Sequence, residues 1–287
     1  MSNTGRARRR AHPFRRVAAA VTAAALLATG ACSSEGDPNR EGDERRSITD
    51  IVRDAVEKAR EHRKEETGNT PGGAQPTPDL GTDGKTSFDY ADYQQTLSST
   101  LALLERYWAQ ALPSVGGTYS SPRRYTYYRS DEGAGPACGQ EAAPPNNAFY
   151  CPAGDFIAWD ETGLMIPYYV GGGDFAASFV LAHEFGHAMQ VRLARQEPLG
   201  VLRELQADCF AGAWAEWVSQ QGLLEAGDLD EATLAVFIAR DLPGTPWTDP
   251  AAHGSGFERT RAFGDGFESG PEACYPAPGE RWIIDQR

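Results

Sequence analysis

Residues 183–187 have the sequence HEFGH, in which two histidines stand four residues apart and a glutamate follows the first. On a helix, His183 and His187 project from the same face, so their ring nitrogens can bind one tetrahedral Zn²⁺ ion. Glu184 lies about 100° away around the helix axis and can reach a zinc-activated water without binding the metal. The motif therefore predicts two zinc ligands and the general base of a metalloprotease.

The sequence around the motif argues against a helix that carries this pattern without a metal. Residues 179–191 are apolar on all sides of the expected helix, so both imidazoles should be buried. A buried polar group without a partner costs free energy. A metal site is therefore favoured over a chance or surface occurrence of the pattern.

A second acidic cluster supplies the third ligand. Glu204 lies 17 residues after His187, which leaves room for a turn and a returning helix. Asp208 is one helical turn further on, where it can accept the free N–H of a ligand histidine and fix its tautomer. Two histidines and a glutamate form a known catalytic zinc set, so we expect His183, His187 and Glu204 as ligands. Asp208 or His253 as the third ligand is the weaker alternative.

The spacing also excludes one subclass of zinc proteases. The longer pattern HExxHxxGxxH, typical of metzincins, would need other residues in place of Gln190 and Leu193. A hydrogen-bond donor should face the oxyanion that develops during hydrolysis. His253, Tyr168 and Tyr169 are candidates for this stabilising role, although packing is favoured for each.

Helices must position most of these residues. Apolar residues recur at helical spacing from residue 88 to 112, so the folded domain should begin there. Further helices are expected at residues 174–195 with Asp174 as N-cap, at 199–220, after Asp228 with Glu231 in a capping-box-like arrangement, and from Ser255 with Glu258. Strands are expected at residues 125–128, 156–159 and 163–170. The pattern predicts a mostly helical α+β fold with a small sheet before the active-site helix.

Gly186 interrupts the expected active-site helix. A glycine inside a helix costs about 1 kcal/mol relative to alanine, which indicates a close neighbour on that side. We expect this neighbour to be a strand along which the backbone of a substrate aligns.

Several short segments occur in a combination that is specific to one family. They are FYCPAGD at 149–155, HEFGHAMQ at 183–190, ELQADCFAG at 204–212, HGS at 253–255, and Arg259 followed by Phe263 and GFESG at 266–270. Over residues 88–275 the chain resembles the putative neutral zinc metallopeptidase family of bacterial envelope proteins. Members often have a further histidine where this chain has Ala188, which is not an expected ligand. The resemblance implies a zincin-type α+β domain with peptidase activity, the ligands His183, His187 and Glu204, and no particular substrate.

The first 31 residues have the features of a secretion signal. Six arginines and no acidic residue precede an apolar run at 17–28, and the small residues at 29–31 precede Cys32. This run is shorter than the ~20 residues that span a bilayer, so an uncleaved transmembrane helix is less favoured. The segment resembles a bacterial lipobox, although Thr29 replaces the usual aliphatic residue. We expect lipidation of Cys32 and anchoring at the extracytoplasmic face of the membrane, with plain secretion as the alternative.

Residues 32–86 are rich in Ser, Gly, Pro and charged residues and cannot bury enough apolar surface to fold. They predict a disordered tether, within which a short solvated helix at 48–64 is possible. The zinc metallopeptidase domain should then occupy residues 87–287.

The net charge of the chain disfavours one class of partner. Loss of residues 1–31 removes six of the 27 basic residues and none of the 40 acidic ones, so the formal net charge changes from −13 to −19. Such an acidic surface disfavours nucleic acid as a partner.

Four cysteines remain in an oxidising compartment, and of three possible connectivities we favour Cys138–Cys151 and Cys209–Cys274. A buried free thiol at Cys209 is the alternative.

Together these features predict an endopeptidase with one Zn²⁺ per chain that acts on a peptide or protein substrate, with Glu184 as general base. Two alternatives remain: a zincin fold without catalysis that binds envelope partners, and a zinc-dependent amidase that acts on cell-wall peptides.

Overall fold

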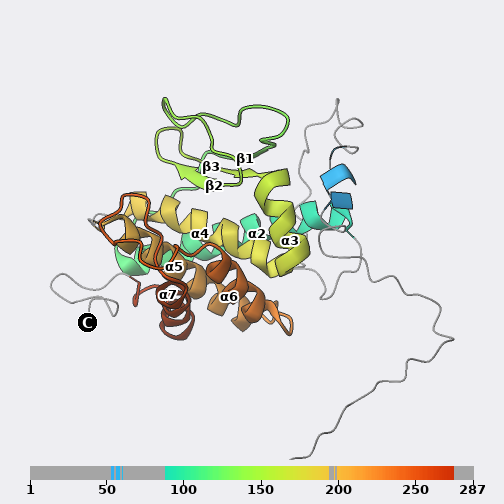
Figure 1. Cartoon of the computed structure of the whole chain (residues 1–287). Coiled ribbons are helices and arrows are strands. Elements are labelled where there is room, and N and C mark those ends of the chain that lie inside the picture. The colour runs from blue at the N-terminus through green and yellow to red at the C-terminus, as the bar shows by residue number, and fades with distance from the viewer. Residues whose placement is uncertain are drawn as a thin grey trace, which may run out of the picture. The chain divides into compact units, whose positions relative to one another are not determined.

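A computed structural model describes residues 53–54, 56–58, 60, 88–193, 197 and 199–274 of the chain. They belong to one compact unit, Arg45–Arg287. Helices dominate it, together with one three-stranded sheet, which confirms the predicted α+β fold (Figure 1). The expected signal at 1–31, Cys32 and most of the expected tether lie outside the described residues. None of the described helices is long and apolar enough to cross a bilayer.

Within the expected tether, the described residues between 53 and 60 are helical. Val56 packs against the core, and Lys58 Nζ donates to the Phe88 carbonyl at 3.2 Å. We expected a solvated helix here, but this stretch contacts the domain through the apolar side chain of Val56 and through two cations, because Arg60 also donates to Asp131.

The sheet consists of β1 (Arg124–Tyr128), β2 (Ala148–Cys151) and β3 (Phe156–Asp160). β3 is central and completely buried, and it pairs in parallel with β1 and antiparallel with β2. β2 is therefore an edge strand, and it packs against α4 (Asp174–Arg192). The sequence predicted β1 and β3 but not β2, whose four residues follow a Pro-Pro-Asn-Asn stretch typical of a loop.

The expectation of a strand at residues 163–170 is wrong. A short π-helical segment, η2 (Glu161–Met165), leads directly into α3 (Ile166–Gly172). The buried residues Met165, Ile166 and Tyr169 follow a helical spacing. Burial of this stripe against the rest of the domain outweighs the strand preference of the aromatic and β-branched residues.

The first long helix, α2 (Tyr90–Ala111), confirms the helix predicted from apolar spacing. Asp89 caps it, because the carboxylate accepts hydrogen bonds from the backbone N–H groups of Ala91 and Asp92 at 2.8 and 3.1 Å. After Ala111 the helix gives way to a 3₁₀ turn, η1 (Leu112–Val115), which contains Pro113. The buried face of α2 packs mainly against α4.

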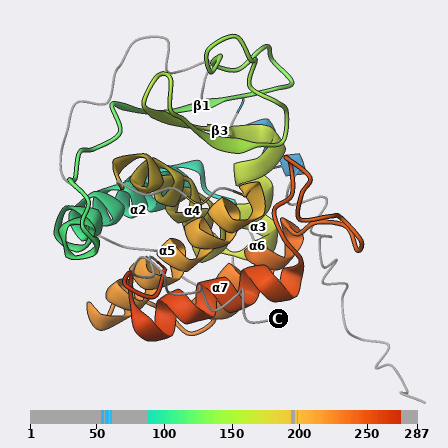
Figure 2. The same ribbon diagram turned by 90° about the vertical axis from the view of Figure 1, so that its left-hand side faces the viewer.

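α4 is the central helix of the domain and is buried along nearly its whole length. In Figures 1 and 2 the sheet lies on one side of it, and α5 (Gly200–Gln220) and α7 (Gly256–Ser269) lie on the other. Gly173, with φ +98°, is its N-cap, and Glu231 accepts the N–H of Phe175 at 2.9 Å. Asp174 is therefore the first residue of the helix and not its cap, because a side chain from another helix does the capping.

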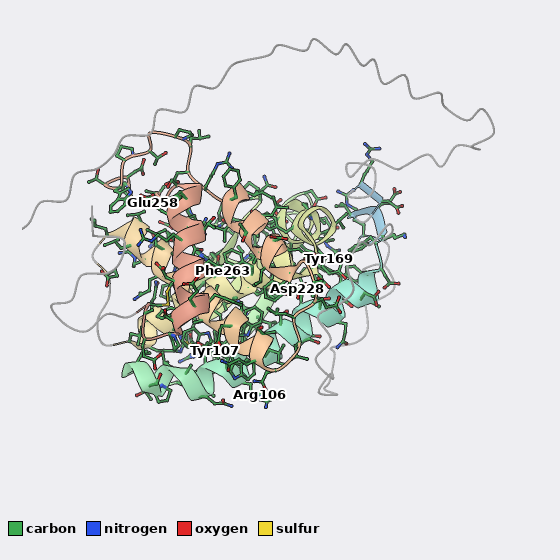
Figure 3. All side chains as sticks on the ribbon, turned by 90° about the horizontal axis from the view of Figure 1, so that it is seen from below. Arg106, Tyr107, Tyr169, Asp228, Glu258 and Phe263 are labelled. Carbon is green, nitrogen blue, oxygen red and sulfur yellow. A yellow bond between two sulfur atoms is a disulfide. The ribbon has the colours of Figure 1, made fainter. Side chains whose placement is uncertain are left out.

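The last two helices differ in how they begin. α6 (Asp228–Ile238) starts after Gly227 at φ +113° with no side-chain cap, so the expected capping-box-like pair of Asp228 and Glu231 is wrong. α7 has the predicted capping box, in which Ser255 and Glu258 bond to each other's backbone N–H groups. Seen from below, α7 with Glu258 and Phe263 lies beside α6, which begins at Asp228 (Figure 3).

α5 and α7 make the closest helix contact of the domain. A Cβ atom on Gly212 would overlap the carbonyl oxygen of Phe263, and one on Gly266 would overlap that of Cys209. Only glycine lets the two backbones approach this closely.

Both favoured disulfides, Cys138–Cys151 and Cys209–Cys274, are present. The first ties the loop before β2 to the end of that strand. The second ties the chain after α7 to α5, where Gln206 Nε2 also donates to the Cys274 carbonyl at 2.8 Å.

Candidate metal centre

Three side chains from two helices converge on one point. His183 and His187 extend from α4, and Glu204 extends from the first turns of α5. The two Nε2 atoms are 3.1 Å apart, and the Glu204 oxygens lie 3.2 Å from His183 Nε2 and 3.5 Å from His187 Nε2. The structure thus brings together the three residues that the sequence singled out as ligands.

These separations match a tetrahedral zinc site. Bonds of ~2.0 to 2.1 Å give about 3.3 to 3.4 Å between neighbouring ligand atoms, close to the 3.1 to 3.5 Å that separates these three. The set offers one carboxylate and two imidazoles, which are donors that zinc prefers. The three residues therefore fit a zinc ion.

In each imidazole ring, Nδ1 bonds to a neighbouring side chain and Nε2 faces the centre. His183 Nδ1 lies 2.8 Å from Asp208 Oδ1, and His187 Nδ1 lies 3.0 Å from Gln190 Oε1. Because both partners are acceptors, each Nδ1 carries a proton and Nε2 is the nitrogen directed at the centre. Two imidazole nitrogens and a carboxylate that converge in this way can bind a cation when Nε2 carries no proton, which is the second indication that the set fits zinc.

Asp208 therefore lies where the sequence placed it, behind His183 rather than on the centre itself. Gln190 is the equivalent partner of His187 and was not among the predicted site residues. Its amide orientation is fixed because Nε2 donates to the Arg203 carbonyl at 2.6 Å. A polar residue between Met189 and Val191, three positions after His187, was the signal for it.

Charge coupling within the cluster is strong. Burial lowers the pKa of His183, but the hydrogen bond and charge of Asp208 outweigh burial and raise the pKa to about 10. Burial also raises the pKa of Glu204, yet the two imidazoles hold it well below its usual value. Protons and a metal ion therefore compete for the same nitrogen atoms.

Gly186 explains how α5 comes close enough for Glu204 to reach the histidines. A Cβ atom on Gly186 would lie 3.1 Å from the Cα of Ala207 and 3.2 Å from its carbonyl oxygen. The neighbour of Gly186 is therefore α5, and the expected substrate-aligning strand at this position is wrong. Because Gly186 has no side chain, α4 and α5, the two helices that carry the three converging residues, can approach each other closely.

Glu184 lies beside the three converging residues without belonging to them. It is 7% exposed, and its Oε2 accepts the backbone N–H of Tyr150 in β2 at 2.9 Å. One carboxylate oxygen is thus held by the edge strand. No residue pattern indicated this backbone donor.

All four residues line a cavity of about 620 Å³. β2, α3, α4, α5 and α6 contribute its other walls, with Phe149, Tyr150, Tyr168, Val180, Arg203 and Ala235 among the lining residues. The cavity is large enough for several residues of an extended peptide and mixes apolar and polar walls.

The three candidates for oxyanion stabilisation lie in different places. Tyr168 lines the cavity, but Tyr169 packs in the core against Phe88 and Tyr93, so its proposed role in the site is wrong. The His253 side chain is half exposed at the cavity, and its Nε2 lies 4.0 Å from Glu204 Oε2. His253 is thus near the centre but is not one of the three converging residues.

A second group of carboxylates, Asp174, Asp228 and Glu231, lies at the starts of α4 and α6. Glu231 accepts the N–H of Phe175, and Asp228 accepts the N–H of Glu225 at 2.8 Å. The group contains no histidine, and the Phe175 N–H that Glu231 accepts belongs to the first turn of α4, so we assign Glu231 to the capping of α4 and no metal to the group.

A family model described as putative neutral zinc metallopeptidase matches residues 67–276. The chain therefore belongs to this family of zinc metallopeptidase-like proteins.

Among its relatives is the uncharacterized protein YpfJ of Escherichia coli K12, which is 36% identical over 201 residues, covering 62% of this chain and 69% of YpfJ. The uncharacterized protein Rv2575 of Mycobacterium tuberculosis H37Rv is 34% identical over 173 residues, covering 50% of this chain and 57% of Rv2575. No solved structure matches the chain.

Proposed function

We propose that this protein is a zinc-dependent endopeptidase in which Glu184 is the general base. One observation carries the proposal: Glu184 lines the same cavity as His183, His187 and Glu204 but stands apart from their convergence. A carboxylate in that position can handle protons without occupying a coordination site. The three converging residues would hold the zinc ion.

Zinc, when bound, supplies a Lewis acid that polarises the scissile carbonyl and lowers the pKa of water. The residues of the chain supply the proton transfers. The Tyr150 N–H holds Oε2 of Glu184, which leaves Oε1 to accept a proton from the attacking water. The same carboxyl group then donates that proton to the leaving amine.

His253 is our candidate for the donor to the developing oxyanion, and Tyr168 is the alternative. His253 supports this role because its ring lies at the cavity near Glu204. Its half-exposed side chain can turn toward a bound peptide.

We also propose that the mature protein lies outside the cytoplasm, with a lipid anchor at Cys32. The arginine-rich, apolar and small-residue segments before Cys32 support export. The two disulfides support it as well, because such bonds persist in oxidising compartments. The partners would be a peptide or protein substrate and the membrane, whereas the acidic surface disfavours nucleic acid.

Metal analysis and peptide digestion test the proposal on the purified full chain. We expect about one zinc per chain, the stoichiometry of a three-residue catalytic site, and cleavage of internal bonds in a peptide library. A chelator should stop the cleavage, and added zinc should restore it. A protein that holds zinc but cleaves no peptide would instead be a binding protein, and cleavage restricted to amide bonds of cell-wall peptides would make it an amidase. A chain that takes up no zinc would contradict the proposal altogether.

A further inference from the structure

A single guanidinium group connects three helices behind the candidate metal centre. Arg259 extends from α7 and donates from Nε to Asp208 Oδ2 and from Nη2 to Asp208 Oδ1, both at 2.8 Å. Its Nη1 donates to the Ala239 carbonyl, at the end of α6, at 2.7 Å. Arg259 is 2% exposed and Asp208 is fully buried.

The two oxygens of Asp208 receive three donors. Oδ1 accepts from both Arg259 Nη2 and His183 Nδ1, and Oδ2 accepts from Arg259 Nε. A carboxylate bonded to one histidine alone could rotate about its Cβ–Cγ bond. The planar, two-pronged guanidinium removes this freedom, because both oxygens must stay in its plane. The direction from which Asp208 receives the His183 N–H is thereby fixed.

We propose that Arg259 is a positioning residue of the zinc centre. It holds Asp208 in one orientation, and through Asp208 it keeps Nε2 of His183 directed toward His187 and Glu204. This inference rests on the proposed zinc site. It adds a residue from α7 to a centre whose other members lie on α4 and α5.

A role for Arg259 only in holding α5 and α7 together does not account for its position at the cavity. The contact between α5 and α7 is already made by Gly212 and Gly266 and by the Cys209–Cys274 disulfide. A buried ion pair adds little to stability compared with apolar packing, because both charges lose their hydration. Arg259 also lines the cavity of the candidate site, which an ion pair between helices does not require.

The test compares Arg259→Lys with Arg261→Lys in the full chain. Lysine keeps the charge but loses the two-pronged geometry. Arg261 lies on the same helix, is about half exposed and pairs with Asp265, so its variant is a matched control. Two measurements are made on folded protein: the zinc Kd by competition with a chelator, and the visible absorption spectrum of the cobalt-substituted protein, which reports ligand orientation.

We expect Arg259→Lys to weaken zinc binding about 10-fold to 100-fold and to change the cobalt spectrum. Arg261→Lys should match the wild type in both measurements. If Arg259→Lys only lowers the melting temperature and leaves the zinc Kd and the cobalt spectrum unchanged, the inference is overturned while the proposed function stands. If the wild type binds neither metal, the proposed function itself fails.

A second pair of variants covers the case in which Arg259→Lys does not fold. Asp208→Asn alone is compared with the double variant Asp208→Asn, Arg259→Gln, which contains no unpaired buried charge. Because Arg259 acts through Asp208, the double variant should bind zinc as weakly as Asp208→Asn and no more weakly. A further tenfold loss in the double variant would show that Arg259 acts by another route and would overturn the inference.

Discussion

The backbone N–H of Tyr150 donates to Glu184 Oε2 at 2.9 Å, so the edge strand β2 and the helix α4 meet at one carboxylate. The amide of glutamine can accept the same hydrogen bond through its oxygen but cannot take a proton. This relationship makes Glu184→Gln a conservative test of the general base.

Glu184→Gln should keep zinc and lose peptide cleavage about 10²-fold to 10⁴-fold, the usual contribution of general acid–base catalysis. The zinc Kd and the initial rate on one cleaved peptide check this. Glu216→Gln, a partly exposed position on α5, serves as the control and should behave like the wild type. Undiminished cleavage by Glu184→Gln would rule Glu184 out as the base.

Gln190→Met should weaken zinc binding about 10-fold to 100-fold, because His187 loses the acceptor that fixes its ring. The Arg203 carbonyl also loses its donor, so the free energy of unfolding should fall by about 1 to 3 kcal/mol. Chelator competition and denaturant unfolding measure the two effects. Gln95→Met, at an exposed site on α2, is the control, and equal zinc affinity in both variants would contradict the assigned role of Gln190.

Removal of zinc should destabilise the fold, because the centre joins α4 to α5. At a free zinc concentration 100 times the Kd, binding to the folded state alone adds about 2.7 kcal/mol. The melting temperature should therefore fall after treatment with chelator and recover with zinc, but not with magnesium, which prefers oxygen ligands. His183→Ala should show no such zinc-dependent shift, and a shift of normal size in that variant would place the metal elsewhere.

Acid should weaken the contact between the β2–β3 turn and α4. Arg192 Nη2 and the Tyr150 hydroxyl each donate to Asp155 at 2.8 Å. Burial raises the pKa of Asp155, but these hydrogen bonds outweigh it and hold the pKa below its usual value. The folded state thus binds this proton less readily than the unfolded state, so the stabilisation is complete above the unfolded pKa of about 3.9 and disappears as pH falls through the lower folded value.

The variant Asp155→Asn tests this because asparagine also tolerates the φ of +50° at this position. Near neutral pH the wild type should be the more stable of the two proteins, and the difference should vanish in strong acid. Denaturant unfolding from pH 2 to 7 measures it. A difference that stays constant across this range would show that the charge of Asp155 is not responsible.

Gly266→Ala and Gly264→Ala should have opposite effects on stability. Alanine at 266 would overlap the Cys209 carbonyl and force α5 and α7 apart, at a cost of about 1 to 3 kcal/mol. Gly264 has open space around it, so alanine there should stabilise the helix by up to about 1 kcal/mol. Thermal unfolding of both variants checks the pair, and equal effects would mean that the backbones are not in close contact.

Local periodicity made much of the centre predictable from sequence. A spacing of four residues on a helix places His183 beside His187, and the same rule places Asp208 one turn after Glu204. Parts that depend on distant or backbone groups were not predictable. The Tyr150 N–H has no side-chain signature, and Arg259 reaches Asp208 from 51 residues further along the chain.

The errors have a similar origin. Residues 163–170 have the composition of a strand, yet a helical stripe of three buried side chains determines their structure. Asp174 has the residue type of a helix cap, but Glu231 from α6 caps α4 instead. The neighbour of Gly186 could be inferred to be close, but sequence could not tell a helix from a strand.

The C-terminal helix α7 also bears on the candidate metal centre without contributing a member to the three converging residues. Arg259 on α7 donates two hydrogen bonds to Asp208, and Asp208 is bonded to His183. Loss of α7 would therefore leave His183, His187 and Glu204 in the chain but remove the group that orients Asp208. Any truncation of the chain before α7 would accordingly reach the metal site as well as the helix packing.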